Sequence, residues 1–157
     1  MAATKALLGG LALSLFTLLP GCDDGGAETI GPRGGVVSSP DGRVTLEVPA
    51  GALQREVFIT IGELDEEGPD GSVTRVYEIE PRFEQLHVPA TLTFDLAPAP
   101  AGVQALDFQA LSMEGLAVLT QKADGWDRLA DREIDAEANT VSGSVLFLSS
   151  YAVALFD

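Results

Sequence analysis

Short runs of alternating apolar and polar residues recur along most of the chain, and this period of two constrains the fold more than any other feature. Residues 43–48, 76–80 and 90–96 alternate in this way, and residues 57–61 are rich in β-branched and aromatic side chains. Glycine, proline and aspartate separate these runs. Runs of this kind are typical of an antiparallel β-sandwich or barrel. Because no segment sustains a helical period, the sequence predicts an all-β domain.

The second half of the chain continues the same pattern. Residues 116–120 are preceded by a similar run at residues 108–113, and the short glycine-containing step between them predicts a hairpin. Residues 140–145 and 150–155 predict two closing strands.

The region before these closing strands is the best candidate for a helix. Residues 127–138 contain few large apolar side chains, so we expect only a short strand around residues 132–134 within loops. Apolar residues make up 46% of the 157 residues, which is enough for one core. A domain of about 125 residues buries roughly two-thirds of its unfolded surface, so folding needs neither a disulfide nor a metal.

The first residues have the composition of an export signal. Lys5 gives a short positive start, and the apolar run of residues 6–19 follows it. This run is shorter than the roughly 20 residues that a helix needs to cross a bilayer. We therefore expect residues 1–21 to be a cleaved signal peptide rather than a membrane helix.

Cys22 is the only cysteine in the chain, and it directly follows this leader. Leu19-Pro20-Gly21-Cys22 resembles the lipobox of bacterial lipoproteins, in which cleavage after a small residue leaves a diacylglycerol-modified cysteine at the new N-terminus. The resemblance implies cleavage between Gly21 and Cys22 and a lipid on Cys22. A plain secretory signal is the alternative. Two or more acyl chains attach a protein stably, because each buried CH₂ adds about 0.8 kcal/mol.

The mature chain is then expected to be a membrane-anchored lipoprotein of the bacterial cell envelope. Asp23 resembles the inner-membrane retention signal of some enteric bacteria, and the sequence leaves the inner and the outer membrane both open. Residues 22–31 contain little to bury and predict a flexible acidic and glycine-rich tether. The folded domain is expected at residues 32–157.

The charge of the mature chain excludes some partners. After Gly21 the chain carries 8 basic and 24 acidic residues, a formal charge of −16. This balance argues against binding to nucleic acid, whose phosphates need basic side chains. It also argues against adsorption to anionic lipid through a basic patch.

Three segments, in order, have a family resemblance: residues 34–53 with their Val-Pro-Ala-Gly-Ala turn, residues 77–94, and residues 145–153. Together they resemble a ZU-five domain, the module shared by zona occludens protein, the uncoordinated-five netrin receptors and ankyrins. The resemblance covers roughly residues 31–157 and implies a ZU-five-like β-sandwich that binds protein. In the turn, Pro49 ends a strand, Gly51 allows a positive φ, and Ala52 and Leu53 pack back under the sheet.

Some ZU-five domains cleave themselves at a closing motif whose histidine activates a serine. Here Phe147 stands in the place of the histidine and Ser149 in the place of the serine. A serine nucleophile needs a base within hydrogen-bond reach, and phenylalanine cannot be that base. No autoproteolysis is therefore expected.

Two polar features are weaker site candidates. His87 is the only histidine, and the sequence gives it no nucleophile and acid partner, so we expect a surface histidine. The acidic run at residues 63–71 contains four weak candidates for calcium ligands, Asp65, Glu66, Glu67 and Asp70. Calcium prefers clustered carboxylates, but this spacing matches no EF-hand loop. We expect a solvated loop, no metal and no cofactor.

The sequence leaves three classes of function open. We expect a non-catalytic interaction or structural module that binds another protein. A carbohydrate- or cell-wall-binding module is the first alternative, with Trp126, Tyr77 and Tyr151 as a sugar platform, although the strand pattern favours core positions for them. An enzyme is the second alternative, but the 24 acidic residues select no catalytic pair of carboxylates.

Overall fold

A computed structural model describes residues 25–97 and 115–156 of the chain. These residues form strands and turns without any α-helix, so no described segment is a helix that could cross a membrane. The strands are β1 (Ala27–Ile30), β2 (Gly35–Ser38), β3 (Val44–Val48), β4 (Val57–Leu64), β5 (Val76–Glu80), β6 (Gln85–Asp95), β7 (Leu116–Lys122), β8 (Gly125–Arg128), β9 (Glu133–Asp135), β10 (Thr140–Phe147) and β11 (Ser150–Leu155). The all-β prediction is confirmed.

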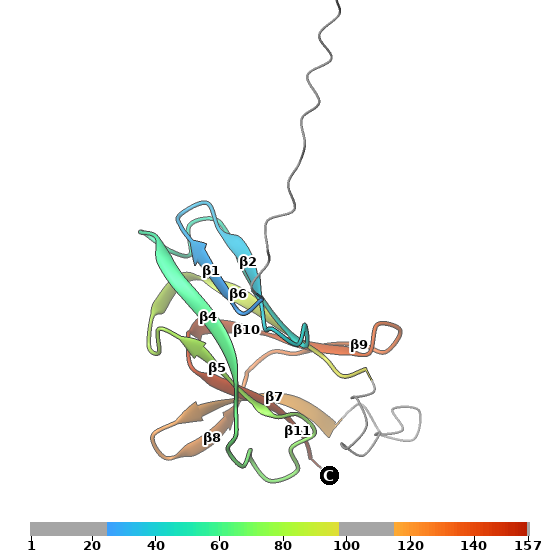
Figure 1. The fold of residues 1–157 in the computed structure, drawn as a ribbon. Coiled ribbons are helices and arrows are strands. Elements are labelled where there is room, and N and C mark those ends of the chain that lie inside the picture. The colour runs from blue at the N-terminus through green and yellow to red at the C-terminus, as the bar shows by residue number, and fades with distance from the viewer. Residues whose placement is uncertain (1–24, 98–114, 157) are drawn as a thin grey trace, which may run out of the picture.

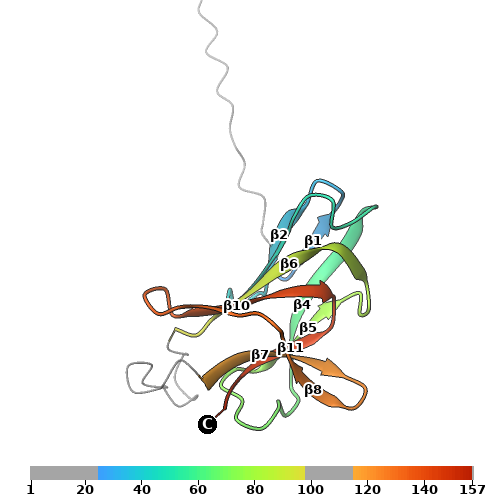
Figure 2. The ribbon, with the colours of Figure 1, turned by 180° about the vertical axis from the view of Figure 1, so that it is seen from behind.

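The strands form two antiparallel sheets that pack as a β-sandwich (Figure 1). One sheet has six strands in the order β1-β4-β5-β11-β7-β8, and the other has five in the order β2-β3-β6-β10-β9. Figure 2 shows the same sandwich from behind. β1 and β2 belong to different sheets and are joined by a tight turn at residues 31–34. This turn therefore connects the sheets along one side of the sandwich.

The core lies between the sheets because alternate side chains of each strand point inward. In β3, Val44, Leu46 and Val48 are buried while the residues between them are not. β4 shows the same alternation, with Ile59 and Ile61 fully buried. Each large aliphatic side chain buried in this way contributes about 1.5–3 kcal/mol relative to exposure. The alternation in the sequence thus marks the core.

The turn after β3 has the conformation that its sequence predicts. β3 ends at Val48, directly before Pro49. Gly51 has a φ of +83°, and Ala52 and Leu53 are both buried beneath the sheet. The expectation for this segment is confirmed.

The structure corrects the expected tether at residues 22–31. Residues 27–30 form β1, which pairs with residues 57–60 of β4, and the Ile61 N–H donates to the Gly26 carbonyl at 2.7 Å. Because backbone groups supply these bonds, a segment with few apolar side chains can form an edge strand, and Ile30 alone enters the core. The ordered domain therefore begins before residue 32.

The other expectations for the second half have mixed outcomes. β7, β10 and β11 confirm the strands expected there, and β9 lies one residue beyond the short strand expected at residues 132–134. β8, which contains Trp126, is an additional strand that pairs with β7. The strand expected at residues 108–113 lies outside the described residues.

Candidate interaction surface

The two ends of the sandwich are defined by its turns. We call residues 31–36, 49–58, 80–90 and 145–149 the distal end. Four contacts join these segments: Gly51 N–H to Pro32 O at 2.9 Å, His87 N–H to Ala52 O at 2.9 Å, Phe83 N–H to Leu148 O at 2.7 Å, and Arg55 Nη2 to Glu84 Oε2 at 2.8 Å. The distal end lies toward the upper left of Figure 1. These contacts bring four stretches of sequence together at one end of the sandwich.

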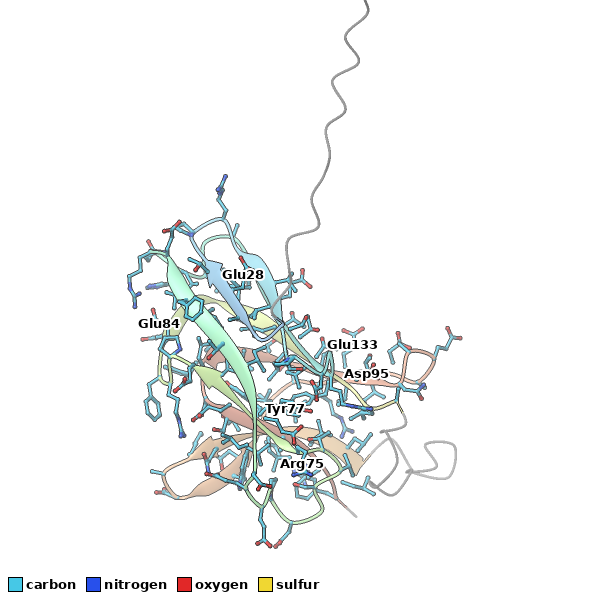
Figure 3. All side chains as sticks on the ribbon, viewed as in Figure 1. Glu28, Arg75, Tyr77, Glu84, Asp95 and Glu133 are labelled. Carbon is cyan, nitrogen blue, oxygen red and sulfur yellow. The ribbon has the colours of Figure 1, made fainter. Side chains whose placement is uncertain are left out.

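We call the opposite end of the β1–β2 hairpin the entry end, because the described chain begins there. It comprises residues 25–26, 39–43 and 61–65. Gly26 has a φ of +105°, and a Cβ on it would lie 2.7 Å from Cγ of Pro40. Glycine is therefore required where the chain passes the β2–β3 turn. Figure 3 shows Glu84 of the distal end well separated from Arg75 and Asp95, which lie nearer the other side of the molecule.

Exposed apolar side chains gather at the distal end. Among the described residues, the exposed large hydrophobic side chains are Val36, Phe58, Phe83, Val88, Leu146 and Phe147, and all six belong to this end. Phe83 is 73% exposed and Phe58 is 62% exposed. Contiguous apolar surface on a soluble domain marks interaction sites, whereas scattered single residues do not. The concentration of all six at one end favours an interaction surface there.

The distal end also differs from the rest of the chain in charge. It contains three basic residues, Arg33, Arg55 and Arg82, and three acidic residues, Glu56, Glu80 and Glu84. Its formal charge is therefore zero, whereas the chain after Gly21 carries −16. Fully buried parts of protein interfaces are depleted of most charged residues and enriched in aromatic residues and arginine. The distal end shares the aromatic and arginine content of such interfaces, with three phenylalanines and three arginines.

A bulge in β6 adds apolar surface at the distal end. Val145 pairs with Ala90, but two residues later Phe147 pairs with Gln85, so four residues of β6 lie opposite the single Leu146. Val88 lies within this stretch of β6 and is exposed. Bulges change the direction of side chains and are frequent at functional edges. Here the bulge places Val88 and Leu146 on neighbouring segments of the exposed surface.

Hydrogen bonds at the entry end link the two sheets. Asp41 accepts hydrogen bonds from Ser39 Oγ, from the Arg43 N–H and from Tyr77 Oη. Burial acts to raise the pKa of the Asp41 carboxyl, but these bonds and the charge of Arg43 together hold the pKa below its usual value of 3.8. Burial, followed by the bond to Asp41, raises the pKa of Tyr77 above its usual value of 10.0. Both groups are bonded internally and serve the fold.

A cleft of about 410 Å³ lies between β1 and β2 at the entry end. Glycine, serine, proline, alanine and valine line most of it, and Glu28 is its one ionisable lining residue. It therefore lacks the several convergent polar groups that a catalytic site needs.

The acidic run does not bring its carboxylates together. Asp65 and Glu63 lie 3.4 Å and 3.5 Å from the guanidinium of Arg75. Farther along the same loop, Gly71 lies beside β11, and the Leu155 N–H of β11 donates to Gly71 O at 2.9 Å. Within residues 25–97 and 115–156, no three histidine, cysteine or acidic side chains are grouped as a metal site. The calcium candidates Asp65, Glu66, Glu67 and Asp70 thus gain no support from the geometry.

The closing motif and His87 lie at the distal end. Ser149 is buried, and its hydroxyl donates to the Gln121 carbonyl at 3.1 Å. Phe147 is half exposed. His87 is exposed, and its backbone N–H is bonded to Ala52 O. The structure gives none of these residues an activating partner.

The three aromatic residues of the sugar-platform alternative do not share an exposed face. Tyr77 and Tyr151 are each 2% exposed and belong to the core between the sheets. Trp126 is half-buried on the other side of the six-stranded sheet, against a small cluster that includes Leu119 and Ala154. Cys22 and Gly21, the predicted lipidation and cleavage residues, lie outside the described residues.

The residues of the distal end were not recognised from the sequence as a site. Leu146 and Phe147 are consecutive apolar residues that interrupt the alternation of β10, and Phe83 lies between Arg82 and Glu84. These interruptions are the available signals. They gain meaning only when the fold brings the segments together.

No protein-family model matches the chain, and a search of the curated proteins finds no match.

Proposed function

We propose that this chain is an exported lipoprotein whose ZU-five-like β-sandwich binds another protein through the distal end without catalysing a reaction. The lipid on Cys22 would hold it at a membrane of the bacterial cell envelope. The observation that carries the proposal is the gathering of all six exposed large apolar side chains of the described residues at one end that has no net charge.

The position of the entry end supports this arrangement. Gly25, the first described residue, follows Cys22 by three residues, which span at most about 11 Å when extended. A lipid on Cys22 would therefore keep the entry end close to the bilayer. The distal end lies at the other end of the β1–β2 hairpin and would be available to a partner.

The distribution of charge supports the same division of roles. A surface with a formal charge of −16 repels most acidic proteins and anionic lipid headgroups. The distal end has no net charge, so a partner meets little long-range repulsion there. Burial of exposed aromatic and aliphatic groups would then supply the binding free energy.

The first test is the intact mass of the mature protein from detergent-extracted membranes. A mass that begins at Cys22 and includes two or three acyl chains supports the lipoprotein. A mass without acyl chains contradicts it. The second test places a photoreactive amino acid at Phe147 or, as a control, at Glu66 beside the entry end. Discrete adducts with another protein at position 147 but not at position 66 support binding by the distal end.

A further inference from the structure

Phe83 combines an unfavourable backbone conformation with an exposed side chain. It lies in the turn between β5 and β6, with a φ of +66°. This left-handed region favours glycine, and a bulky residue there typically costs 1–3 kcal/mol. The ring is 73% exposed, so burial of the side chain does not offset that cost. Burial in the core therefore gives no reason for phenylalanine at this position.

Hydrogen bonds hold the backbone of the turn that carries Phe83. The Phe83 N–H donates to Leu148 O at 2.7 Å, and the Leu148 N–H donates to Glu84 O at 3.0 Å. The guanidinium of Arg82 bonds to Glu78 at 3.1 Å and to Gln121 at 3.2 Å. The same guanidinium lies 5.4 Å from the centre of the Phe83 ring, within the range of a cation–π contact. Phe83 is therefore presented by a turn that is bonded to three strands, β5, β7 and the end of β10.

An aromatic side chain on a hydrogen-bonded turn loses little backbone conformational entropy on binding. Energetically dominant interface residues are enriched in aromatic groups that fill a pocket in the partner and are surrounded by weaker contacts. Phe147, Leu146 and Val88 lie on the segments beside the turn and can supply those contacts.

From this geometry we infer that Phe83 is the hot-spot residue of the distal end, and that its ring enters an apolar pocket on a folded partner protein. The inference rests on the proposed function. The pocket is expected to carry little net charge, since the distal end is neutral. A projecting ring on a turn suits a concave protein surface better than the flat face of a sugar. The membrane that holds Cys22 would lie toward the entry end and so would not be the occupant.

The experiment uses the full-length lipidated chain in the cells that make it. A photoreactive phenylalanine analogue replaces Phe147, and the adduct is quantified with Phe83 intact, with Phe83→Gly and with Phe58→Ala. Phe58 is the matched control, because it is an exposed phenylalanine of the distal end that lies within a regular strand. Thermal unfolding of each variant is measured on the purified protein.

We expect Phe83→Gly to reduce the adduct at least about tenfold, and Phe58→Ala to reduce it less than about threefold. Glycine relieves the left-handed strain, so the Tm of Phe83→Gly should be unchanged or higher by up to about 5 °C.

An adduct that persists in Phe83→Gly, or that is lost equally in both variants, overturns the inference but leaves the proposed function standing. A Tm lowered by about 10 °C or more shows a structural role and also overturns it. A crosslink between two copies of this chain overturns the proposal that the partner is a different protein. Absence of any adduct with Phe83 intact contradicts the proposed function itself.

Discussion

Tyr77 Oη donates a hydrogen bond to Asp41 Oδ2 across 2.6 Å and so joins the two sheets at the entry end. Tyr77 belongs to β5 of the six-stranded sheet, and Asp41 lies in the turn between β2 and β3 of the five-stranded sheet. The tyrosine ring also packs edge-on against Phe94, with ring centres 6.0 Å apart. The bond therefore fixes the β2–β3 turn against the opposite sheet.

Removing this bond should destabilise the domain. Tyr77→Phe keeps the ring and its packing but removes the hydroxyl, so we expect a loss of about 1–2 kcal/mol in the free energy of unfolding. Asp41→Ala should cost more, because Ser39 and Arg43 also lose their acceptor. Denaturant unfolding of both single variants and the double variant measures the coupling. Fully additive effects would contradict a direct interaction.

The Asp41 carboxylate should make stability depend on pH in acid. Its pKa is lowered in the folded state, so its contribution is present above the unfolded value of 3.8 and is lost as pH falls through the lower folded value. We expect the difference in unfolding free energy between wild type and Asp41→Asn to be largest near neutral pH and to decrease progressively as the pH falls below 3.8. Denaturant titrations across this range provide the measurement. A constant difference would show that Asp41 does not cause the pH dependence.

The two tyrosines should resist ionisation at high pH. Burial raises the pKa of Tyr151 from 10.0 to about 12, and the pKa of Tyr77 is also raised. A raised pKa contributes stability below pH 10, and this contribution is lost as pH rises through the folded value. Because the chain has only these two tyrosines, the tyrosinate absorbance should stay low up to about pH 11 and then rise together with unfolding. A titration midpoint near 10 in the folded protein would contradict the burial of both rings.

Two glycines with similar backbone conformations provide a matched test of packing. Gly34 has a φ of +78°, and a Cβ there would lie 2.3 Å from Val48 O. Gly42 has a φ of +72°, and a Cβ there would meet nothing within 4 Å. We expect Gly42→Ala to cost about 1 kcal/mol from left-handed strain alone, and Gly34→Ala to cost at least about 2 kcal/mol more. Equal losses in a denaturant series would show that Gly34 is not in close contact with β3.

Cys22→Ala should separate attachment from folding. The substitution removes the proposed acceptor of the lipid at a position before the first described residue, so we expect the Tm of the domain not to change. We expect the variant to leave the membrane fraction and to lose incorporation of a labelled fatty acid. Continued membrane association without the label would contradict attachment through Cys22.

The sequence was sufficient for strands whose side chains alternate. Residues 43–48 could be assigned because Val44, Leu46 and Val48 must share one face of a strand. The same reasoning missed β1, in which Ile30 is the only large apolar residue. Backbone pairing with β4, rather than side-chain burial, makes residues 27–30 a strand. The local composition of a segment does not show which strand of a sheet has an unpaired edge for that segment to pair with.

The distal end could not be derived in the same way. Its four segments span residues 31–149, and they become neighbours only through strand pairing and turn contacts. The positive φ of Phe83 is likewise not encoded by its residue type, since phenylalanine avoids that region. It is imposed by the bonds to Leu148, a residue 65 positions later in the chain.

By itself, the sequence determined the all-β class, most of the strands and the conformation of the turn at residues 49–53, because these depend on local periodicity and on the backbone preferences of proline and glycine. Only the tertiary structure decided which apolar side chains stay exposed and which charges lie together. Exposure depends on what other segments cover a residue, and that is fixed by pairing between strands far apart in the chain. The neutral apolar surface around Phe83 is therefore a property of the assembled sandwich.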